Sequence, residues 1–278
     1  RVRRNLHRLE KGLTARPRVS VFAEGYIGST VSDFSRLAAA AGNAETIVWG
    51  SEVLTHYFEI VSSTECIDAA HRAYVQTQQQ LEARSATVAE ESARTESGKL
   101  PDFDAFLALC RHRKATRYYW DEPVPRELLK KACSAAVESP SACNRQAFEI
   151  FVFDKKEKLD SIRDLSIGTG TFAHNMQCLL FVVGNLNAYG EERDRHLIYI
   201  DGSLMSMSLG LALESLGLST CYINWPDLEE LEVPLAKVLG LPPTKKCILC
   251  ISVGYADDSP IPVSAKKSVD DVLHFDVG

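Results

Sequence analysis

Three short stretches of this 278-residue sequence hold side chains whose types and spacing could do chemistry. The first, RKATR at residues 113–117, places Arg113, Lys114 and Arg117 within five positions, after an apolar segment predicted to be helical. If the helix continues, Arg113 and Arg117 share one face, and such a cluster can hold a phosphate. Cations in a last helical turn also complement the helix dipole, and this stretch alone favours that simpler interpretation.

The second stretch, SPSACNRQ at residues 139–146, lies between a predicted helix and a predicted strand. Its small side chains would let a flat ligand approach the backbone, and its Asn and Gln amides can donate to and accept from a heterocycle. A polar turn is the ordinary alternative, but the combination of residue types favours a binding loop. The third stretch, Lys266 and Lys267, could complete an anion site with the first.

Other candidate sites are weaker. Cys143 could be a nucleophile with His112 or His174 as its partner, but nothing in the sequence places them beside it. Cys247 and Cys250 have the spacing of metal ligands, yet residues three apart on a strand point to opposite faces. The seven histidines are scattered without metal-ligand spacing. We therefore expect no metal site.

The elements that must position these stretches are strands interleaved with helices. The predicted buried strands are residues 147–153, 178–184 and 247–255. Asp102 is predicted to cap one helix and Pro125 to begin another. Residues 197–218 are almost free of charge, so a helix there must be buried nearly all round. This pattern indicates an α+β or α/β sandwich.

A polar stretch at residues 76–99 divides the chain, and residues 32–75 before it have a helical pattern. We therefore predict an N-terminal helical extension and linker at residues 1–98 and a second domain at residues 99–278. Seven of the first 18 residues are Lys or Arg and one is Glu. We expect this basic segment to dock on the protein's own acidic surface or on a partner subunit.

Charge and hydropathy exclude several classes of partner. The net charge of −6 disfavours a nucleic-acid-binding protein. The longest clean apolar run, residues 178–184, is too short to cross a bilayer, and the basic start lacks the apolar region of a signal peptide. The chain does not begin with Met, which leaves a trimmed leader open. The eight cysteines suit free thiols in a cytoplasmic protein.

Four motifs in this order resemble the nitroreductase-like flavoprotein superfamily. They are RKATRYY, PSACNRQAF, YIDGSLMSMSLGLALESLGLSTC, and SVGYADDSP followed by AKKSVDDV. The resemblance covers roughly residues 103–276, and RRNLHRLEKGL at the start is similar to an N-terminal extension of one subgroup. The resemblance implies an α+β fold: a nitroreductase-like α/β sandwich with a central mixed sheet flanked by helices, plus the extension.

The resemblance also implies a homodimer that binds FMN non-covalently at its interface. In this comparison the first and third stretches hold the phosphate, and the second lines the isoalloxazine ring. The implied cofactor-binding residues are Arg113, Lys114, Ala115, Arg117, Pro140, Ser141, Ala142, Asn144, Gln146, Thr220, Cys221, Lys266 and Lys267. Ala115 stands where the family often has Ser, and Lys266 where Arg is common. No side chain is implied as a catalytic acid or base.

The implied activity is ping-pong transfer of a hydride from NAD(P)H through FMN to a small organic acceptor, such as a nitro, quinone or ene compound. The extension at residues 1–98 could roof the pocket and select the substrate. Two alternatives stay open: a flavin-binding or interaction protein without turnover, and an enzyme that uses Cys143 as a nucleophile. We expect no nucleic-acid or membrane partner.

Overall fold

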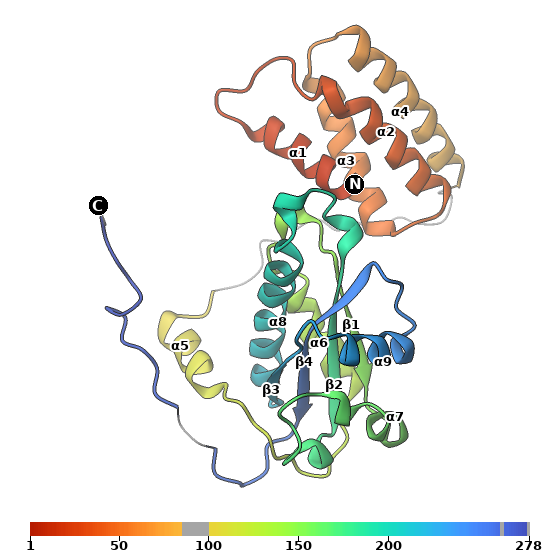
Figure 1. The fold of residues 1–278 in the computed structure, drawn as a ribbon. Helices are drawn as coiled ribbons and strands as arrows, with labels where there is room; N and C mark the ends of the chain where they lie inside the picture. Colours follow the sequence, from red (N-terminus) through yellow and green to blue (C-terminus); the bar gives the residue numbers. More distant parts are fainter. Residues whose placement is uncertain (85–99, 262–263, 277–278) are drawn as a thin grey trace. The chain divides into compact units, whose positions relative to one another are not determined.

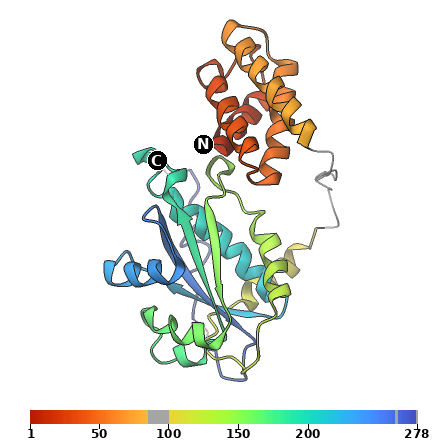
Figure 2. The ribbon, with the colours of Figure 1, turned by 90° about the vertical axis from the view of Figure 1, so that its right-hand side faces the viewer.

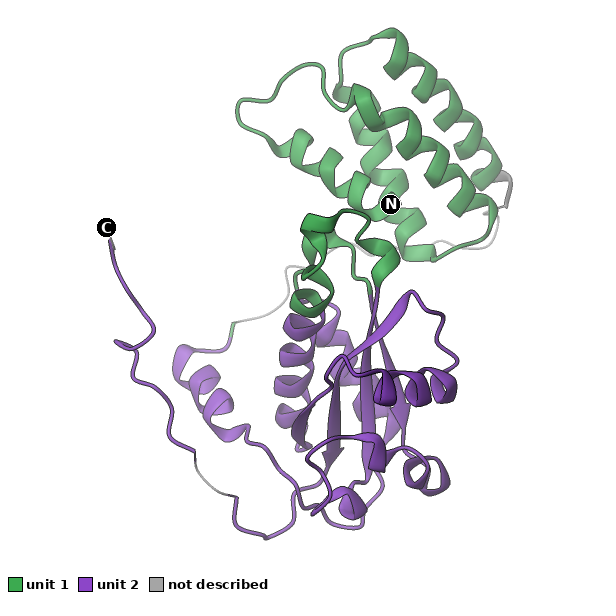
Figure 3. Ribbon diagram, in the orientation of Figure 1, with its two compact units in different colours: residues 1–100, 140–147, 186–201 green, residues 101–139, 148–185, 202–278 purple. Residues whose placement is uncertain are grey.

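The computed structural model describes residues 1–84, 100–261 and 264–276, and the chain forms two compact units. Figure 3 colours the two units, whose segments alternate along the chain. Unit 1 contains Arg1–Leu100, Pro140–Ala147 and Leu186–Asp201, and unit 2 contains Pro101–Ser139, Phe148–Asn185 and Gly202–Gly278. Each unit has a separate hydrophobic core. The predicted division between residues 98 and 99 stays a prediction.

Unit 1 begins with four helices that pack side by side in both ribbon views (Figures 1 and 2). They are α1 (Val2–Thr14), α2 (Glu24–Ala39), α3 (Ala44–Ile60) and α4 (Glu65–Arg84). The helical pattern predicted for residues 32–75 is confirmed. The polar stretch predicted as a linker continues α4 as far as Arg84, and residues 85–99 lie outside the described residues.

The core of unit 1 forms because each helix carries an apolar stripe. Leu6 and Leu9 of α1 are fully buried, together with Phe34 of α2 and Tyr57 of α3. The Asn43 side chain accepts a 2.8 Å hydrogen bond from the backbone N–H of Thr46, which caps the start of α3.

The basic face of α1 contacts carboxylates of unit 1. Arg4 donates to Glu191 at 2.7 Å, and Arg1 pairs with the buried Asp33. The expectation that the basic segment docks on the protein's own acidic surface is therefore confirmed within unit 1. The two remaining segments of this unit contain the 3-10 turns η1 (Ala142–Asn144), η4 (Leu186–Ala188) and η5 (Glu192–Asp194).

Unit 2 is built on a four-stranded sheet in the order β1-β2-β4-β3. The strands are β1 (Phe148–Phe153), β2 (Cys178–Asn185), β3 (Ser219–Asn224) and β4 (Lys245–Gly254). The three predicted strands are confirmed, and β3 is an addition that the sequence analysis missed. Each pair of named strands is antiparallel. In place of the expected mixed sheet, the described residues contain one isolated parallel bridge, between Ala115 and Thr220.

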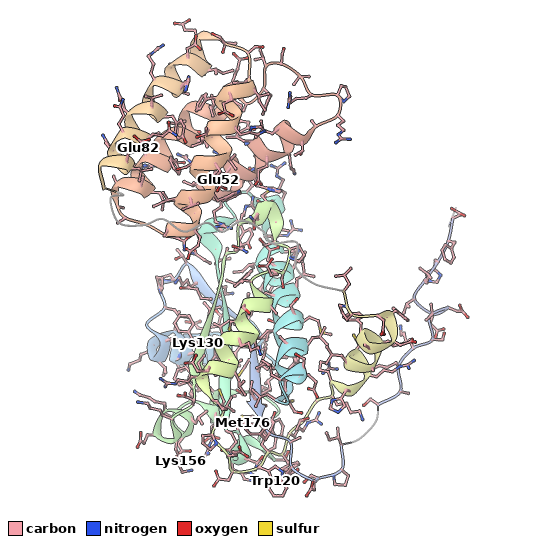
Figure 4. The ribbon with its side chains drawn as sticks, turned by 180° about the vertical axis from the view of Figure 1, so that it is seen from behind. Glu52, Glu82, Trp120, Lys130, Lys156 and Met176 are labelled. Atoms are coloured by element: carbon pink, nitrogen blue, oxygen red, sulfur yellow. The ribbon has the colours of Figure 1, made fainter. Side chains whose placement is uncertain are left out.

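Helices cover both faces of this sheet, with α6 and α8 on one face and α9 on the other (Figure 2). The helices of unit 2 are α5 (Phe103–His112), α6 (Arg126–Ala136), α7 (Lys156–Asp160), α9 (Glu229–Leu239) and the part of α8 (Leu197–Ser215) that follows Asp201, with 3-10 turns η2 (Arg163–Leu165) and η3 (Ala173–Asn175). The predicted starts of α5 and α6 are confirmed, because Asp102 caps the first and Pro125 precedes the second. Figure 4 shows α6 from behind, marked by Lys130.

β2 is buried on both faces because helices cover the sheet from both sides. Leu179 and Phe181 alternate with Leu180 and Val182 along the strand, and all four are buried. The first two belong to the core cluster that also contains Leu235 of α9. The continuous apolar run that predicted this strand therefore results from its central place in the sheet.

The long helix α8 is buried on one face only. Met205, Leu209 and Leu213 are fully buried, but Leu204 and Met207 are 44% and 43% exposed. The prediction that this helix is buried nearly all round is therefore wrong within a single copy of the chain, because the sheet covers only one side of the helix. By length and composition alone, Glu192–Ser215 could cross a membrane, but a helix that packs in a protein core has the same character.

We expect Gly210→Ala to lower the free energy of unfolding by about 1–3 kcal/mol, because the added methyl group would overlap the Tyr222 hydroxyl. That hydroxyl donates to the Ser206 carbonyl at 2.7 Å, so the ring cannot move freely. The control is Gly28→Ala, also inside a helix but with open space around the new methyl group. It should raise stability by up to about 1 kcal/mol. Urea denaturation measures both, and equal effects would contradict close packing of α8 on β3.

Candidate functional site

The first stretch, RKATR, is extended rather than helical. Helix α5 ends at His112, and Arg113 is its C-terminal cap. The Thr116 backbone N–H then donates to the Thr220 carbonyl at 3.0 Å, which aligns the segment with the start of β3. The prediction that Arg113 and Arg117 share a helix face is therefore wrong, because pairing with a strand replaces the next helical turn.

Extended backbone places alternate residues on opposite sides. Thr116 is buried, whereas Ala115 packs against the core cluster of unit 2. The Arg117 guanidinium lies 5.9 Å from the ring centre of Phe172, a member of that same cluster. Arg113, Ala115 and Arg117 therefore lie along one edge of this core.

This segment carries three positive charges, with Arg113 and Arg117 at this edge and Lys114 on the alternate side. Within the described part of the chain, none of Arg113, Lys114 and Arg117 forms an ion pair. Burial raises the pKa of the Cys221 thiol, and the charges of Arg117 and Arg113 oppose that shift. The charges of both guanidinium groups therefore act on Cys221, which follows Thr220 in β3. This arrangement suits an anionic ligand.

Tyr119, which the sequence analysis did not single out, anchors the segment. It is 2% exposed, and its hydroxyl donates to the Thr116 carbonyl at 2.6 Å and lies 2.8 Å from the Ser252 hydroxyl. The Asn175 side chain bonds to both the N–H and the carbonyl of Tyr119. Burial raises the pKa of Tyr119, so the hydroxyl stays a donor. In the sequence, the two tyrosines that directly follow the basic run at residues 113–117 could have indicated such an anchor.

A shallow pocket opens beside this segment. Its lining residues are Ala115, Thr116, Arg117, Tyr118, Asp257, Ser259, Pro260 and Ile261. Residues 115–118 line one side of the pocket and residues 257–261 the other. A backbone hydrogen bond joins the two sides, from the Asp257 N–H to the Tyr118 carbonyl at 3.2 Å. The Asp257 carboxylate in turn accepts a 2.8 Å bond from the Ser259 backbone N–H. The extended segment therefore lies between β3 and the chain that follows β4.

The third stretch lies in the extended C-terminal segment, which leaves the body of unit 2 (Figure 1). Lys266 and Lys267 are exposed, and neither forms an ion pair or a hydrogen bond with another described residue. The predicted convergence of these lysines with Arg113 stays a prediction.

Residues 140–146 of the second stretch belong to unit 1 and include the predicted residues Pro140, Ser141, Ala142, Asn144 and Gln146. A buried carboxylate holds one side of this loop. Asp201, 2% exposed, accepts from the Ala142 backbone N–H at 3.0 Å and from the Tyr189 hydroxyl at 2.7 Å. The Ser141 hydroxyl accepts from the Gln146 backbone N–H at 3.0 Å, which closes the loop on itself.

The backbone of this loop is strained. Cys143, Asn144 and Gln146 all have positive φ angles, of 53°, 50° and 47°. Glycine and, to a lesser degree, Asn tolerate this left-handed conformation, whereas residues such as Cys143 and Gln146 adopt it at a cost of about 1–2 kcal/mol each. Such strain persists only where the surroundings impose it, and it is concentrated at functional sites.

Arg145 lies at the base of the same loop. Its side chain is buried and forms a 2.8 Å ion pair with Asp194, and it lies 5.1 Å from the ring centre of Tyr189. Its Nε and Nη1 atoms have no hydrogen-bond partner among the described residues. Arg145 thus ties the loop to the segment at residues 186–201 within unit 1.

The alternative based on Cys143 gains no support from side-chain geometry. In the described residues, no histidine forms a hydrogen bond with Cys143, and His112 instead bonds to Glu214 at 2.7 Å. In the described ranges, no three neighbouring His, Cys, Asp or Glu side chains could hold a metal ion.

Comparisons with known proteins agree on one family. The model described as "Nitroreductase family" matches residues 110–255. A candidate NADH dehydrogenase/NAD(P)H nitroreductase of Methanothermobacter thermautotrophicus is 25% identical over 163 residues, 59% of this chain and 83% of that protein.

Solved structures share the fold. The FMN-dependent nitroreductase of Clostridium difficile R20291 is 22% identical with a TM-score of 0.54, over 62% of this chain and 99% of that one. A nitroreductase family protein of Streptococcus pneumoniae TIGR4 is 21% identical with a TM-score of 0.54, over 61% and 98%. The predicted fold class is therefore confirmed.

We expect Tyr119→Phe to lower the free energy of unfolding by about 1–3 kcal/mol, because the Thr116 carbonyl and the Ser252 hydroxyl would lose a buried partner. The control is Tyr118→Phe, which removes the same atom from the exposed neighbouring residue. Thermal and urea unfolding compare the two variants. Indistinguishable stabilities would show that Tyr119 does not anchor the segment.

Proposed function

Because one family model matches more than half of this chain, the chain belongs to the nitroreductase family, and from that premise we propose an FMN-dependent oxidoreductase. It would transfer a hydride from NAD(P)H to a small organic acceptor in a ping-pong cycle. The names of the relatives, which include NAD(P)H and FMN, support this proposal. The observation that carries it is the group of three unpaired cations at residues 113–117 beside β3.

The chemistry of this group fits the FMN phosphate. A phosphate monoester carries nearly two negative charges at neutral pH, and Arg113, Lys114 and Arg117 together supply three positive ones. Each hydrogen bond to a charged group contributes about 1.5–3 kcal/mol. We propose that these residues hold the phosphate and ribityl chain, with Lys266 or Lys267 reaching the same phosphate.

The loop of the second stretch fits a flat ring. Ser141 and Ala142 are small, and Asn144 and Gln146 offer amide donors and acceptors for the edge of a heterocycle. We propose that Pro140, the two small residues and Asn144 line the isoalloxazine, and that Gln146 supports the loop. Thr220 and Cys221 would add backbone groups from β3.

FMN, when bound, supplies the hydride chemistry. The chain's own residues would then bind and orient the cofactor, keep the phosphate charge neutralised and leave one open face for reductant and acceptor in turn. We assign no side chain as a catalytic acid or base.

We propose that the enzyme is a homodimer. The outer face of α8 presents Leu204 and Met207, and the C-terminal segment presents Val269 and Phe275, which are 67% and 78% exposed. Apolar patches of this kind mark sites of protein association. A second copy of the chain would cover them and would place its own loop at residues 140–146 beside the cofactor.

We also propose that the protein works in the cytoplasm without a nucleic-acid or membrane partner. All eight cysteines are free thiols, as expected in a reducing compartment. The net charge of −6 supports the absence of a nucleic-acid partner.

The purified protein should show a flavin absorbance spectrum, and it should oxidise NADH or NADPH when a quinone or a nitroaromatic compound is supplied. Steady-state absorbance at the nicotinamide band measures this activity. A protein that is yellow but inactive with every acceptor would be a flavin-binding protein without turnover. A colourless protein that cannot be reconstituted with FMN would refute the proposed function.

Arg113→Ala should weaken FMN binding about tenfold to a hundredfold, because one or more charge-assisted hydrogen bonds to the phosphate are lost. Arg111→Ala is the control, since Arg111 is an exposed cation two positions earlier in α5. Fluorescence titration with FMN measures both dissociation constants. Normal flavin content in the Arg113 variant would remove that residue from the site.

Leu204→Glu should dissociate the dimer, because it places a charge on an apolar face that the partner would bury. Val48→Glu on α3 is the control, with a comparably exposed apolar side chain in unit 1. Light scattering coupled to size-exclusion chromatography reports the mass. A wild-type monomer, or a dimer unaffected by Leu204→Glu, would contradict the proposed interface.

A further inference from the structure

One side chain of α1 reaches the strained loop of the second stretch. Arg3 Nε donates to the Asn144 carbonyl at 2.9 Å, and Arg3 Nη2 donates to Gln146 Oε1 at 2.7 Å. All of these residues belong to unit 1. A planar guanidinium with several donors in fixed directions can bridge two acceptors in this way, whereas a lysine ammonium group cannot match the fork.

Helices α1 and α3 hold Arg3 in place. Its Nη1 donates to the Thr46 hydroxyl at 2.9 Å, and the guanidinium lies 5.0 Å from the ring centre of Trp49. Trp49 is itself fixed, because its indole N–H donates to Glu10 at 2.7 Å. The guanidinium is therefore pre-organised before it meets the loop, and little freedom is lost when it binds there.

The two loop acceptors lie within the strained backbone. Asn144 and Gln146 both have positive φ angles, of 50° and 47°. Asp201 holds the other side of the loop through the Ala142 N–H. Because Arg3 has donors only, Gln146 must present its oxygen to Arg3, which sets the orientation of its amide. Arg3 therefore opposes relaxation of the loop at two of its three positions with positive φ angles.

We propose that Arg3 is a positioning residue for the flavin ring, and that the N-terminal helices serve as the support of the ring-binding loop. The inference rests on the proposed function, since it takes residues 140–146 as the part of the site that meets the isoalloxazine. Arg3 acts on the ring through the backbone of Asn144 and the side chain of Gln146. The phosphate group would be held by Arg113 and not by Arg3.

The test compares two probes, FMN and riboflavin, which share the ring and differ in the phosphate. Arg3→Gln should weaken both by the same factor, about tenfold, because the three hydrogen bonds that the guanidinium donates are lost. Arg113→Ala should weaken FMN by a larger factor than riboflavin, because only FMN carries the phosphate. Arg3→Lys keeps the charge without the fork, so it should resemble Arg3→Gln. Fluorescence titration measures each dissociation constant.

A second readout does not need a flavin. Hydrogen exchange of the backbone amides at residues 142–146 should accelerate in flavin-free Arg3→Gln protein, because the loop loses its support. Thr46→Val is a milder variant, since it removes one acceptor from Arg3 without touching the loop. It should change affinity and exchange in the same direction by a smaller factor.

The control is Arg8→Gln, the same chemical change on the same helix. Arg8 is exposed and lies over Tyr26, 3.8 Å from its ring centre, away from the loop. If Arg3→Gln and Arg8→Gln have the same flavin affinities and exchange rates, Arg3 only stabilises the helices and the inference fails. If the wild type binds neither FMN nor riboflavin, the proposed function itself fails, and the role of Arg3 at the ring fails with it.

Discussion

The hydrogen bond from the Thr116 N–H to the Thr220 carbonyl is the interaction on which the candidate site of unit 2 depends. It ends the helical course of the chain after α5 and aligns the next residues with β3. Arg117 thereby lies at the edge of the core, beside the ring of Phe172, and its charge and that of Arg113 act on Cys221. The buried Tyr119 hydroxyl secures the same segment to β4 through Ser252. Long-range pairing thus concentrates positive charge that has no carboxylate partner in the described chain.

In unit 1, side chains hold the strained loop at residues 140–146 in place. Asp201 and Arg3 contact the loop from two elements, one by accepting from a backbone N–H and one by donating to a backbone carbonyl. Complementary donors and acceptors can keep left-handed residues in place where no glycine is available. The helices of the N-terminal extension are therefore part of the loop's support, in addition to any part they play in substrate selection.

The open apolar surfaces have a common cause. A sheet covers one side of a helix, so α8 carries apolar residues on a second side that a single chain cannot bury. The C-terminal segment is likewise rich in exposed apolar side chains and has no core of its own. A second copy of the chain would remove both surfaces from water, which is the physical basis of the proposed dimer.

Local pattern was enough to predict three of the four strands, the starts of α5 and α6, the course of α8 and the run of cations that follows α5. Periodicity and capping depend on neighbours in the sequence, so they can be read without a fold. Strand β3, the extended course of residues 114–117, and the roles of Tyr119 and Arg3 were decided by tertiary structure. Each depends on a partner far away in the chain, such as Thr220 for Thr116 or Asn144 for Arg3. No local pattern specifies such a partner, because the free energy of the contact exists only once the fold has brought the two groups together.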